Sequence, residues 1–141
     1  MMINKALYIA KVAHKGQVDK GGNPYVMHPI AVSQLVDSEE EKVVALLHDV
    51  VEDTDVTLDR LKLEGFSDNI IAAVCALTKQ PGVAYDDYIS TLKENSVAVR
   101  VKIADITHNS DISRIPNPTE KDLERIKRYE MTLAKLKNAN Y

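Results

Sequence analysis

The sequence predicts an all-α fold, and three observations support this prediction. Hydrophobic residues make up 45% of the 141 residues, as expected of a chain that buries an apolar core. Glycine and proline contribute only five residues each, and no segment alternates between β-branched and polar residues as a half-buried strand does. Hydrophobic residues recur instead at helical spacing along most of the chain. We therefore expect a single domain over residues 1–141 with about seven or eight helices.

The first helix is predicted over residues 3–15, where the apolar spacing is helical until it stops at Gly16. Residues 16–28 are rich in turn-forming types, which indicates an irregular segment. The second helix is expected to start near Pro29, because proline is favoured in the first turn of a helix.

A capping-box pattern predicts the start of the third helix, with Ser38 followed three positions later by Glu41. The run that follows is apolar on most sides of the helix and extends to Val51. A helix that is apolar around most of its circumference is buried, so we expect this one to lie in the core.

The second half of the chain is divided by caps and helix breakers. Gly65, Pro81 and Pro116 interrupt the helical spacing, and Thr119 with Asp122 caps the last helix. The last helix is expected to carry one apolar face with Leu123, Ile126, Leu133 and Leu136. The helices are expected over about residues 58–64, 67–77, 86–93 and 97–113, and from Thr119 onward.

Cys75 is the single cysteine, so no internal disulfide can form. Its apolar neighbours indicate a residue of the helix core, and a reactive thiol is the alternative interpretation.

The charge balance excludes a general affinity for anions. The 18 basic and 21 acidic residues give a net charge of −3. Because no global basic field exists, we expect no binding to nucleic acid or to a membrane surface, and an anionic ligand must be held locally. No apolar run approaches the ~18 residues that span a bilayer, and the N-terminus lacks a signal-peptide core. We expect a cytoplasmic protein, and the sequence leaves its oligomeric state open.

The most informative residues are polar ones inside the predicted core helix. Burying ionisable groups costs several kcal/mol unless another charge compensates them, and a metal ion would do so. Helical spacing would place the four residues on two adjacent faces of the helix. The acidic pair Glu52 and Asp53 would lie one turn beyond the pair His48 and Asp49. The alternative is the polar face of an amphipathic helix with a surface histidine. The four residues are His48, Asp49, Glu52 and Asp53.

Two further segments offer polar residues in similar settings. His28 precedes Pro29 at a helix start, where it can turn inward, although a loop histidine is the simpler interpretation. Asp105 lies in an apolar stretch with Lys102 and Asn109 on the same helix face, and a buried Lys102–Asp105 salt bridge is the alternative to a metal ligand there.

Two imidazoles and two carboxylates form a ligand set that suits Mn²⁺, Fe²⁺, Co²⁺ or Zn²⁺ and leaves coordination positions for water and substrate. The sequence therefore predicts a catalytic centre with one divalent metal. His14 and His108 lack such a constellation and are expected to be hydrogen-bonded or exposed. The predicted metal ligands are His28, His48, Asp49 and Asp105.

Three motifs in order resemble the HD-superfamily hydrolase domain of RelA/SpoT enzymes, and specifically the stand-alone small alarmone hydrolases. The similarity extends to the segment before His28 and to the terminal helix with Tyr129, so it covers nearly the whole chain. The motifs are His28-Pro29, then His48-Asp49-Val50-Val51-Glu52-Asp53-Thr54, then Lys102-Ile103-Ala104-Asp105 followed by Asn109.

The resemblance implies an all-helical HD-type domain around one metal site, with the four residues above holding one divalent ion, usually manganese. It implies removal of pyrophosphate from the 3′ position of guanosine 3′,5′-bis(diphosphate), called ppGpp, or of its pentaphosphate precursor. Glu52 and Asp53 match the acidic pair to which we assign water orientation and proton transfer. No synthetase domain is recognisable, so we expect degradation of alarmones and not synthesis.

The predicted substrate-binding residues match the family less closely than the predicted metal ligands do, because this sequence carries different charges at some of these positions. Asp19 stands where the family commonly has an arginine that packs against guanine, and Asp111 replaces a further arginine. Tyr129 is a candidate to pack against a purine instead, although a core or surface tyrosine is the alternative interpretation. The predicted substrate-binding residues are Lys20, Lys102, Asn109 and Tyr129.

Two other functions remain open at this point. An HD-type phosphohydrolase for another nucleotide, such as an adenosine alarmone, a dinucleotide phosphate or a deoxynucleotide, would share every metal ligand. A non-catalytic nucleotide-binding module is the second alternative, and the acidic pair Glu52 and Asp53 argues against it because binding alone requires no proton transfer.

Overall fold

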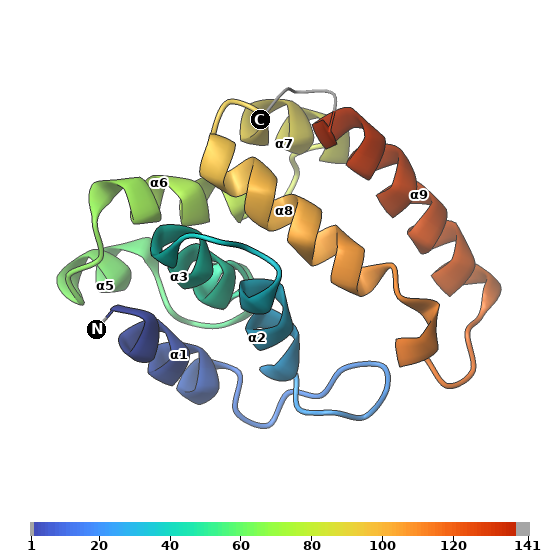
Figure 1. Cartoon of the computed structure of the whole chain (residues 1–141), viewed down its shortest axis with the longest axis horizontal. Helices are drawn as coiled ribbons and strands as arrows, with labels where there is room; N and C mark the ends of the chain where they lie inside the picture. The colour runs from blue at the N-terminus through green and yellow to red at the C-terminus, as the bar shows by residue number, and fades with distance from the viewer. Residues whose placement is uncertain (1, 138–141) are drawn as a thin grey trace.

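The computed structural model describes residues 2–137, and these residues form an all-helical fold (Figure 1). Their only β-type feature is an isolated bridge between Val18 and Pro24, and none of their helices has the length and apolar composition to cross a membrane. The elements are α1 (Met2–Ala13), α2 (Met27–Gln34), α3 (Glu39–Leu47), α4 (Val50–Asp53), α5 (Leu58–Leu63), α6 (Asp68–Leu77), α7 (Tyr85–Leu92), α8 (Ser96–Asn109), the short 3₁₀ helix η1 (Ile112–Arg114) and α9 (Glu120–Lys137).

Helix α3 lies at the centre and packs against α1, α2, α6 and α8. Its residues 43–47 are all at most 3% exposed, as predicted for a helix that is apolar on most sides. The capping box is present, because Ser38 accepts from the Glu41 backbone N–H while the Glu41 side chain accepts from that of Ser38. The amino end of the central helix is therefore fixed by local contacts.

The third predicted helix does not continue to Val51, and this prediction was wrong. Helix α3 ends at Leu47, and a separate single turn, α4, begins at Val50. The Ala45 carbonyl accepts from Nδ1 of His48 at 2.5 Å, which replaces the regular ladder bond of an uninterrupted helix. The helix breaks at His48 and Asp49, so the described residues contain one helix more than expected.

Helix α8 ends at Asn109, four residues earlier than predicted. The Asp111 side chain accepts from the Ser113 backbone N–H and caps η1, which redirects the chain. Arg114 then turns back and donates to the His108 carbonyl at 3.0 Å, an oxygen at the end of α8 that also accepts from the Asp111 backbone N–H.

Helix α2 begins at Met27, two residues before the predicted start, and this places His28 inside a helix. His28 and Pro29 are both buried. The irregular segment before it, residues 14–26, joins α1 to α2, and in Figure 1 it extends below α2 toward η1.

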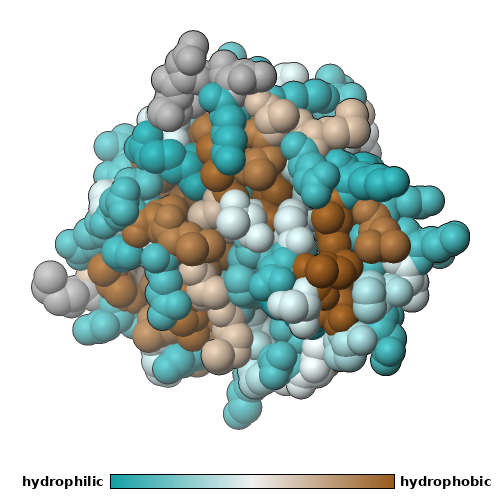
Figure 2. Space-filling model, turned by 45° about the vertical axis from the view of Figure 1, so that its right-hand side comes forward, coloured by the Kyte–Doolittle hydropathy of each residue, from teal (hydrophilic) through white to brown (hydrophobic). Residues whose placement is uncertain are grey.

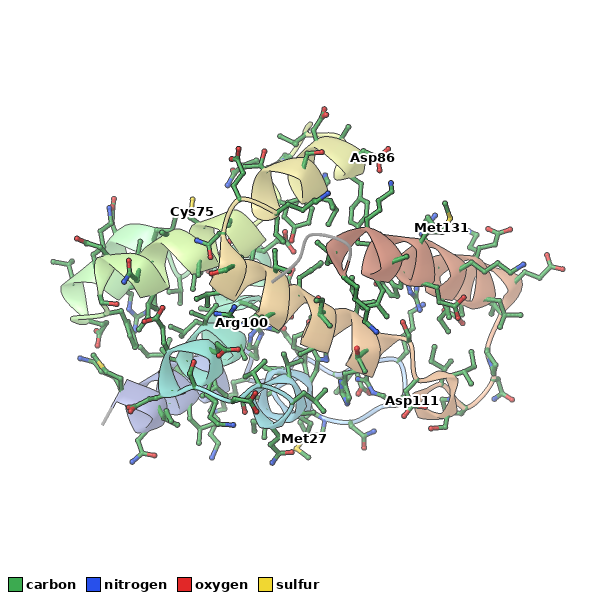
Figure 3. The ribbon with its side chains drawn as sticks, turned by 45° about the horizontal axis from the view of Figure 1, so that its top comes forward. Met27, Cys75, Asp86, Arg100, Asp111 and Met131 are labelled. Carbon is green, nitrogen blue, oxygen red and sulfur yellow. The ribbon has the colours of Figure 1, made fainter. Side chains whose placement is uncertain are left out.

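Cys75 is exposed, so its prediction as a core residue was wrong. Its thiol points away from the body of the protein on α6 (Figure 3), while the preceding Val74 is fully buried. Adjacent helical positions differ by about 100° in direction, and apolar neighbours in sequence therefore do not imply burial.

Helix α9 buries less of its predicted apolar face than expected. Leu136 is buried and Leu133 is partly buried, but Leu123 is 48% exposed and its neighbour Asp122 is buried instead.

Figure 2 shows hydrophilic side chains between separate hydrophobic areas on the face of the molecule that it presents. The exposed apolar residues on that face therefore do not join into one apolar surface.

The orientation of α5 can be tested with one pair of substitutions. Leu61→Ala removes a fully buried side chain and should lower the free energy of unfolding by about 2–5 kcal/mol. Leu63→Ala makes the same change at an 88% exposed position and should alter it by less than about 0.5 kcal/mol. Urea denaturation measures both values, and equal losses would contradict this orientation.

Candidate metal centre and adjoining pocket

Three segments bring the four predicted metal ligands together. His28 comes from α2, His48 and Asp49 from the turn between α3 and α4, and Asp105 from α8. One potential ligand atom of each residue lies within 4.8 Å of all the others. The helix break described above is what allows two consecutive residues, His48 and Asp49, to face the same point.

The spacing of these atoms fits ligands of one ion. Asp105 Oδ1 lies 2.7 Å from Nε2 of His28 and 3.2 Å from Nε2 of His48. Asp49 Oδ2 lies 3.1 Å from His48 Nε2 and 3.9 Å from His28 Nε2. Ligand atoms about 2.0–2.2 Å from a common divalent ion are separated by similar distances. The donor set therefore matches a nitrogen-oxygen site for a divalent transition metal.

The charges within the cluster also require a cation. Burial alone would lower the pKa of His48, but Asp49 and Asp105 raise it well above its ordinary value. Burial likewise opposes ionisation of Asp105, yet Lys102 and His48 hold the pKa of this carboxyl well below its ordinary value. The carboxylates of Asp49 and Asp105 thus favour positive charge at the point that they share, and a divalent ion could supply it.

The outer nitrogens of the two histidines are held by other groups, which leaves both Nε2 atoms directed at the cluster. His48 Nδ1 contacts the Ala45 carbonyl, which can only accept, so this nitrogen carries the proton. His28 Nδ1 lies 2.7 Å from Nδ1 of His108. Burial and the nearby Arg114 lower the pKa of His108 to about 4, so its neutral ring can accept the proton of His28. His108 therefore orients a candidate ligand, which the sequence did not reveal.

Tyr25 is a second residue of the centre that sequence reasoning missed. Its hydroxyl donates to Asp49 Oδ2 at 2.6 Å, and burial together with Asp49 raises the pKa of this hydroxyl above its ordinary value. The ring of Tyr25 packs against that of His14, which is buried and hydrogen-bonded through Nδ1 to Gln17 as predicted. The turn segment before α2 thus supports one of the carboxylates.

Lys102 and Asn109 both contact the second carboxylate of the cluster. Lys102 Nζ lies 3.2 Å from Asp105 Oδ2 and 5.4 Å from the centre of the Tyr88 ring. Asn109 Nδ2 donates to Asp105 Oδ1 at 3.2 Å. The Lys102–Asp105 salt bridge, considered as an alternative from sequence, thus exists beside the histidine contacts of the same carboxylate.

Glu52 and Asp53 lie next to the cluster on α4, with carboxylate oxygens within 4.8 Å of Asp49. Glu52 Oε1 accepts from the Lys79 backbone N–H at 2.6 Å, which fixes its carboxyl group. Partial burial, with the charge of Asp49, raises the pKa of both carboxyls above their ordinary values. Raised pKa values make both groups stronger proton acceptors close to the candidate metal centre.

A pocket of about 260 Å³ opens beside the cluster on the side of His28 and Tyr25. Three of the predicted substrate contacts, Lys20, Asn109 and Tyr129, line it, whereas Lys102 lies over Tyr88 instead. Its remaining lining residues are Asp19, Gly21, Asp111, Arg114, Ile115 and Arg125.

Each cation of this pocket has an acidic partner. Asp122 Oδ1 accepts from Lys20 Nζ at 2.5 Å and from Arg125 at 2.9 Å. The contact with Lys20, followed by the hydrogen bonds from Thr119, holds the pKa of Asp122 well below its ordinary value. Asp19 Oδ2 lies 3.4 Å from Arg114. Asp122, which the sequence suggested as a helix cap, therefore also joins the loop after α1 to α9, and it does cap α9 through Thr119.

Arg114 and Arg125 were not predicted as site residues. Both side chains come from segments after the last motif, and local sequence carries no signal of which side of the chain they face. A search for cations near the last helix would have identified them only as candidates.

A family model described as "HD domain" matches residues 6–125 of this chain. This range includes all four candidate metal ligands and the acidic pair.

Curated relatives show where the sequence similarity lies. The chain is 33% identical over 116 residues to guanosine-3′,5′-bis(diphosphate) 3′-pyrophosphohydrolase of Haemophilus influenzae, with 72% of this chain and 17% of that protein covered. It is 29% identical over 122 residues to the bifunctional (p)ppGpp synthase/hydrolase SpoT of Escherichia coli, with 76% and 17% covered. The chain therefore spans about one sixth of the length of these relatives.

One solved structure resembles the whole fold. It is described as a metazoan orthologue of SpoT that hydrolyses ppGpp, and it superimposes with a TM-score of 0.78 at 24% identity. The match covers 96% of this chain and 84% of that chain, so it supports the helical arrangement over nearly the whole chain.

The cluster predicts that the protein binds one divalent ion per chain. At an ion concentration about 100 times Kd, binding should add about 2.7 kcal/mol to the free energy of unfolding, and chelation should remove it. Asp49→Asn, which removes one anionic ligand, should abolish most of this gain, whereas Asp59→Asn at an exposed position of α5 should retain it. Elemental analysis and thermal unfolding with and without Mn²⁺ measure both effects. A wild-type protein without bound metal and without a thermal shift would contradict the site.

Proposed function

The chain belongs to the HD-domain family, and on this premise we propose that it is a manganese-dependent hydrolase that removes the 3′ pyrophosphate from ppGpp or its pentaphosphate precursor. The observation that carries the proposal is the adjacency of three features: a cluster suited to a divalent metal, two carboxyls with raised pKa values, and a pocket that meets the cluster at His28. The names of the curated relatives support the choice of substrate.

In this proposal the metal ligands are His28, His48, Asp49 and Asp105, and residues 1–141 act as one HD domain. When bound, the ion supplies a Lewis acid that polarises the phosphoryl group and lowers the pKa of a coordinated water. Two neutral histidines and two aspartates carry a charge of −2, which would balance a 2+ ion, and Lys102 beside Asp105 would add a positive charge toward a phosphate group.

Glu52 and Asp53 provide the proton transfer of the hydrolysis. One carboxylate accepts a proton from the attacking water, and the water oxygen forms a bond to the phosphorus attached to O3′. The bond between this phosphorus and O3′ then breaks, and O3′ takes a proton as GDP and pyrophosphate form from ppGpp. We assign the base role to Glu52, because the Lys79 backbone N–H fixes its carboxyl group and its pKa is raised.

The pocket accommodates the nucleoside and its 5′ phosphates in this proposal. Lys20 contacts phosphate, Asn109 lies between the metal cluster and the pocket, and the ring of Tyr129 is available to the base. Lys102 does not line this pocket. It lies near Glu52 and, in this proposal, contacts the transferred phosphoryl group.

One observation favours a second candidate, a phosphohydrolase of the same type for a less highly charged nucleotide. Asp19 and Asp122 partner all three cations of the pocket, so the pocket itself attracts a polyanion weakly. An adenosine alarmone, a dinucleotide phosphate or a deoxynucleotide would use the same metal cluster. A non-catalytic binding module explains neither Glu52 nor Asp53 beside that cluster.

A nucleotide panel tests the proposed substrate. The manganese-loaded protein should convert ppGpp to GDP and pyrophosphate at a higher kcat/KM than the adenosine analogue or deoxynucleoside triphosphates. Chelation should stop the reaction, because the water then loses its activating ion. Chromatography of the products measures each rate, and faster turnover of another nucleotide would favour the second candidate.

The role of Glu52 is tested by Glu52→Gln, which preserves shape and the contact with Lys79 but removes the proton acceptor. Turnover should fall by about 10²–10⁴-fold while metal content and thermal stability stay at the wild-type level. Glu94→Gln makes the same change at an exposed position of the chain and should leave turnover unchanged. If the Glu52→Gln variant keeps near-native turnover, Glu52 takes no part in the chemistry.

A further inference from the structure

Arg114 lines the pocket from an unexpected element, the 3₁₀ helix that follows α8. Its guanidinium is mostly buried and reaches across to the loop that follows α1. The two segments touch closely, because a Cβ atom added to Gly21 would lie only 2.7 Å from the Arg114 carbonyl oxygen. The packing of this loop against η1 therefore places Arg114 in the wall of the pocket.

Three of the five N–H donors of the Arg114 guanidinium already have protein acceptors. One terminal nitrogen donates to the His108 carbonyl at 3.0 Å and to Asn109 Oδ1 at 3.3 Å. The other donates to Asp19 Oδ2 at 3.4 Å. A terminal nitrogen carries two protons, so the first of these nitrogens has none left for a ligand.

Asp19 is itself fixed in place. Its Oδ1 accepts from the backbone N–H groups of Gly21 and Asn23, both at 2.9 Å, which leaves Oδ2 directed at Arg114. The ion pair neutralises the guanidinium and holds its plane against a rigid turn. A neutralised guanidinium with three of its five donors taken is a weak phosphate ligand, whereas its flat face can contact a planar group without any further donor.

Lys20 and Arg125, unlike Arg114, are not fully neutralised by their acidic partner. They share the single carboxylate of Asp122, so the group of three retains one excess positive charge. This end of the pocket suits a phosphate group, whereas the Arg114 end suits an uncharged, planar group.

We propose that the face of the Arg114 guanidinium is the platform on which the purine base of the nucleotide lies, with Asp19 as its positioning residue. Planar cations stack on the faces of bases, and such stacking needs no free edge. The inference rests on the proposed function for the identity of the ligand as a nucleotide. It assigns the specificity for a base to two residues that the motifs of the sequence do not include.

Arg114→Lys separates stacking from charge, because lysine keeps the positive charge beside Asp19 but has no planar face. Calorimetric titration of the metal-loaded protein, freed of unbound ion, would compare GDP with inorganic pyrophosphate, which has no base. We expect GDP to bind about tenfold more weakly to the variant, while the affinity for pyrophosphate stays unchanged. Arg100→Lys, in the first half of α8 and paired with Glu41, is the matched control and should change neither affinity. Figure 3 shows Arg100 on this helix and Asp111 beyond its carboxyl end.

Two results would overturn the inference: an unchanged affinity for GDP, or an equal loss for GDP and pyrophosphate, which would make Arg114 a phosphate ligand. If thermal unfolding shows that Arg114→Lys does not fold, Asp19→Asn replaces it, since asparagine keeps the acceptor for Gly21 and Asn23 but removes the ion pair. This variant should bind GDP several-fold more weakly and pyrophosphate no more weakly, and unchanged binding of GDP would overturn the inference.

Turnover of ppGpp by the wild-type protein, measured in parallel, keeps the two proposals distinguishable. A wild type that does not hydrolyse ppGpp contradicts the proposed function, while a base-dependent loss of GDP affinity in Arg114→Lys would still support the platform. Turnover together with an unaltered GDP affinity in that variant contradicts only the platform.

Discussion

The carboxylate of Asp105 is the contact on which the rest of the centre depends. It is buried on α8 and is approached by His28, His48, Lys102 and Asn109 from three segments of the chain. A buried carboxylate costs several kcal/mol unless hydrogen bonds and positive charges surround it, so these segments are held in one arrangement by a shared electrostatic requirement. The same requirement produces a group of donors that a divalent ion can satisfy.

Around this carboxylate, two departures from regular helical structure create the site. The turn at His48 and Asp49 ends the most deeply buried helix and directs two consecutive side chains to one point. The early end of α8 exposes the His108 carbonyl, to which Arg114 returns. In both places a side chain donates to a backbone carbonyl at the end of a helix, namely His48 to Ala45 and Arg114 to His108.

The ion pairs within the pocket, more than its net charge, decide where positive charge is available to a ligand. Asp19 and Asp122 tie the loop after α1 to η1 and α9, and they divide the pocket into a neutral end and an end with excess positive charge. The replacement of an expected basic residue by Asp19 is therefore accompanied by a cation from a distant segment. The pocket thus offers a place for an uncharged planar group at one end and for an anionic group at the other, beside the candidate metal cluster.

The sequence by itself determined the helical fold class, the burial of the third helix and the residue types of the candidate metal centre, because periodicity and capping act over a few neighbouring residues. It placed Cys75 in the core and extended the third helix to Val51, since local pattern does not show which face packs or which acceptor a side chain will take. Only the tertiary structure decided that His108 would hold His28 and that Asp19 would meet Arg114, 95 residues away. Such pairs depend on how whole helices pack against one another, and that packing is a property of the entire core.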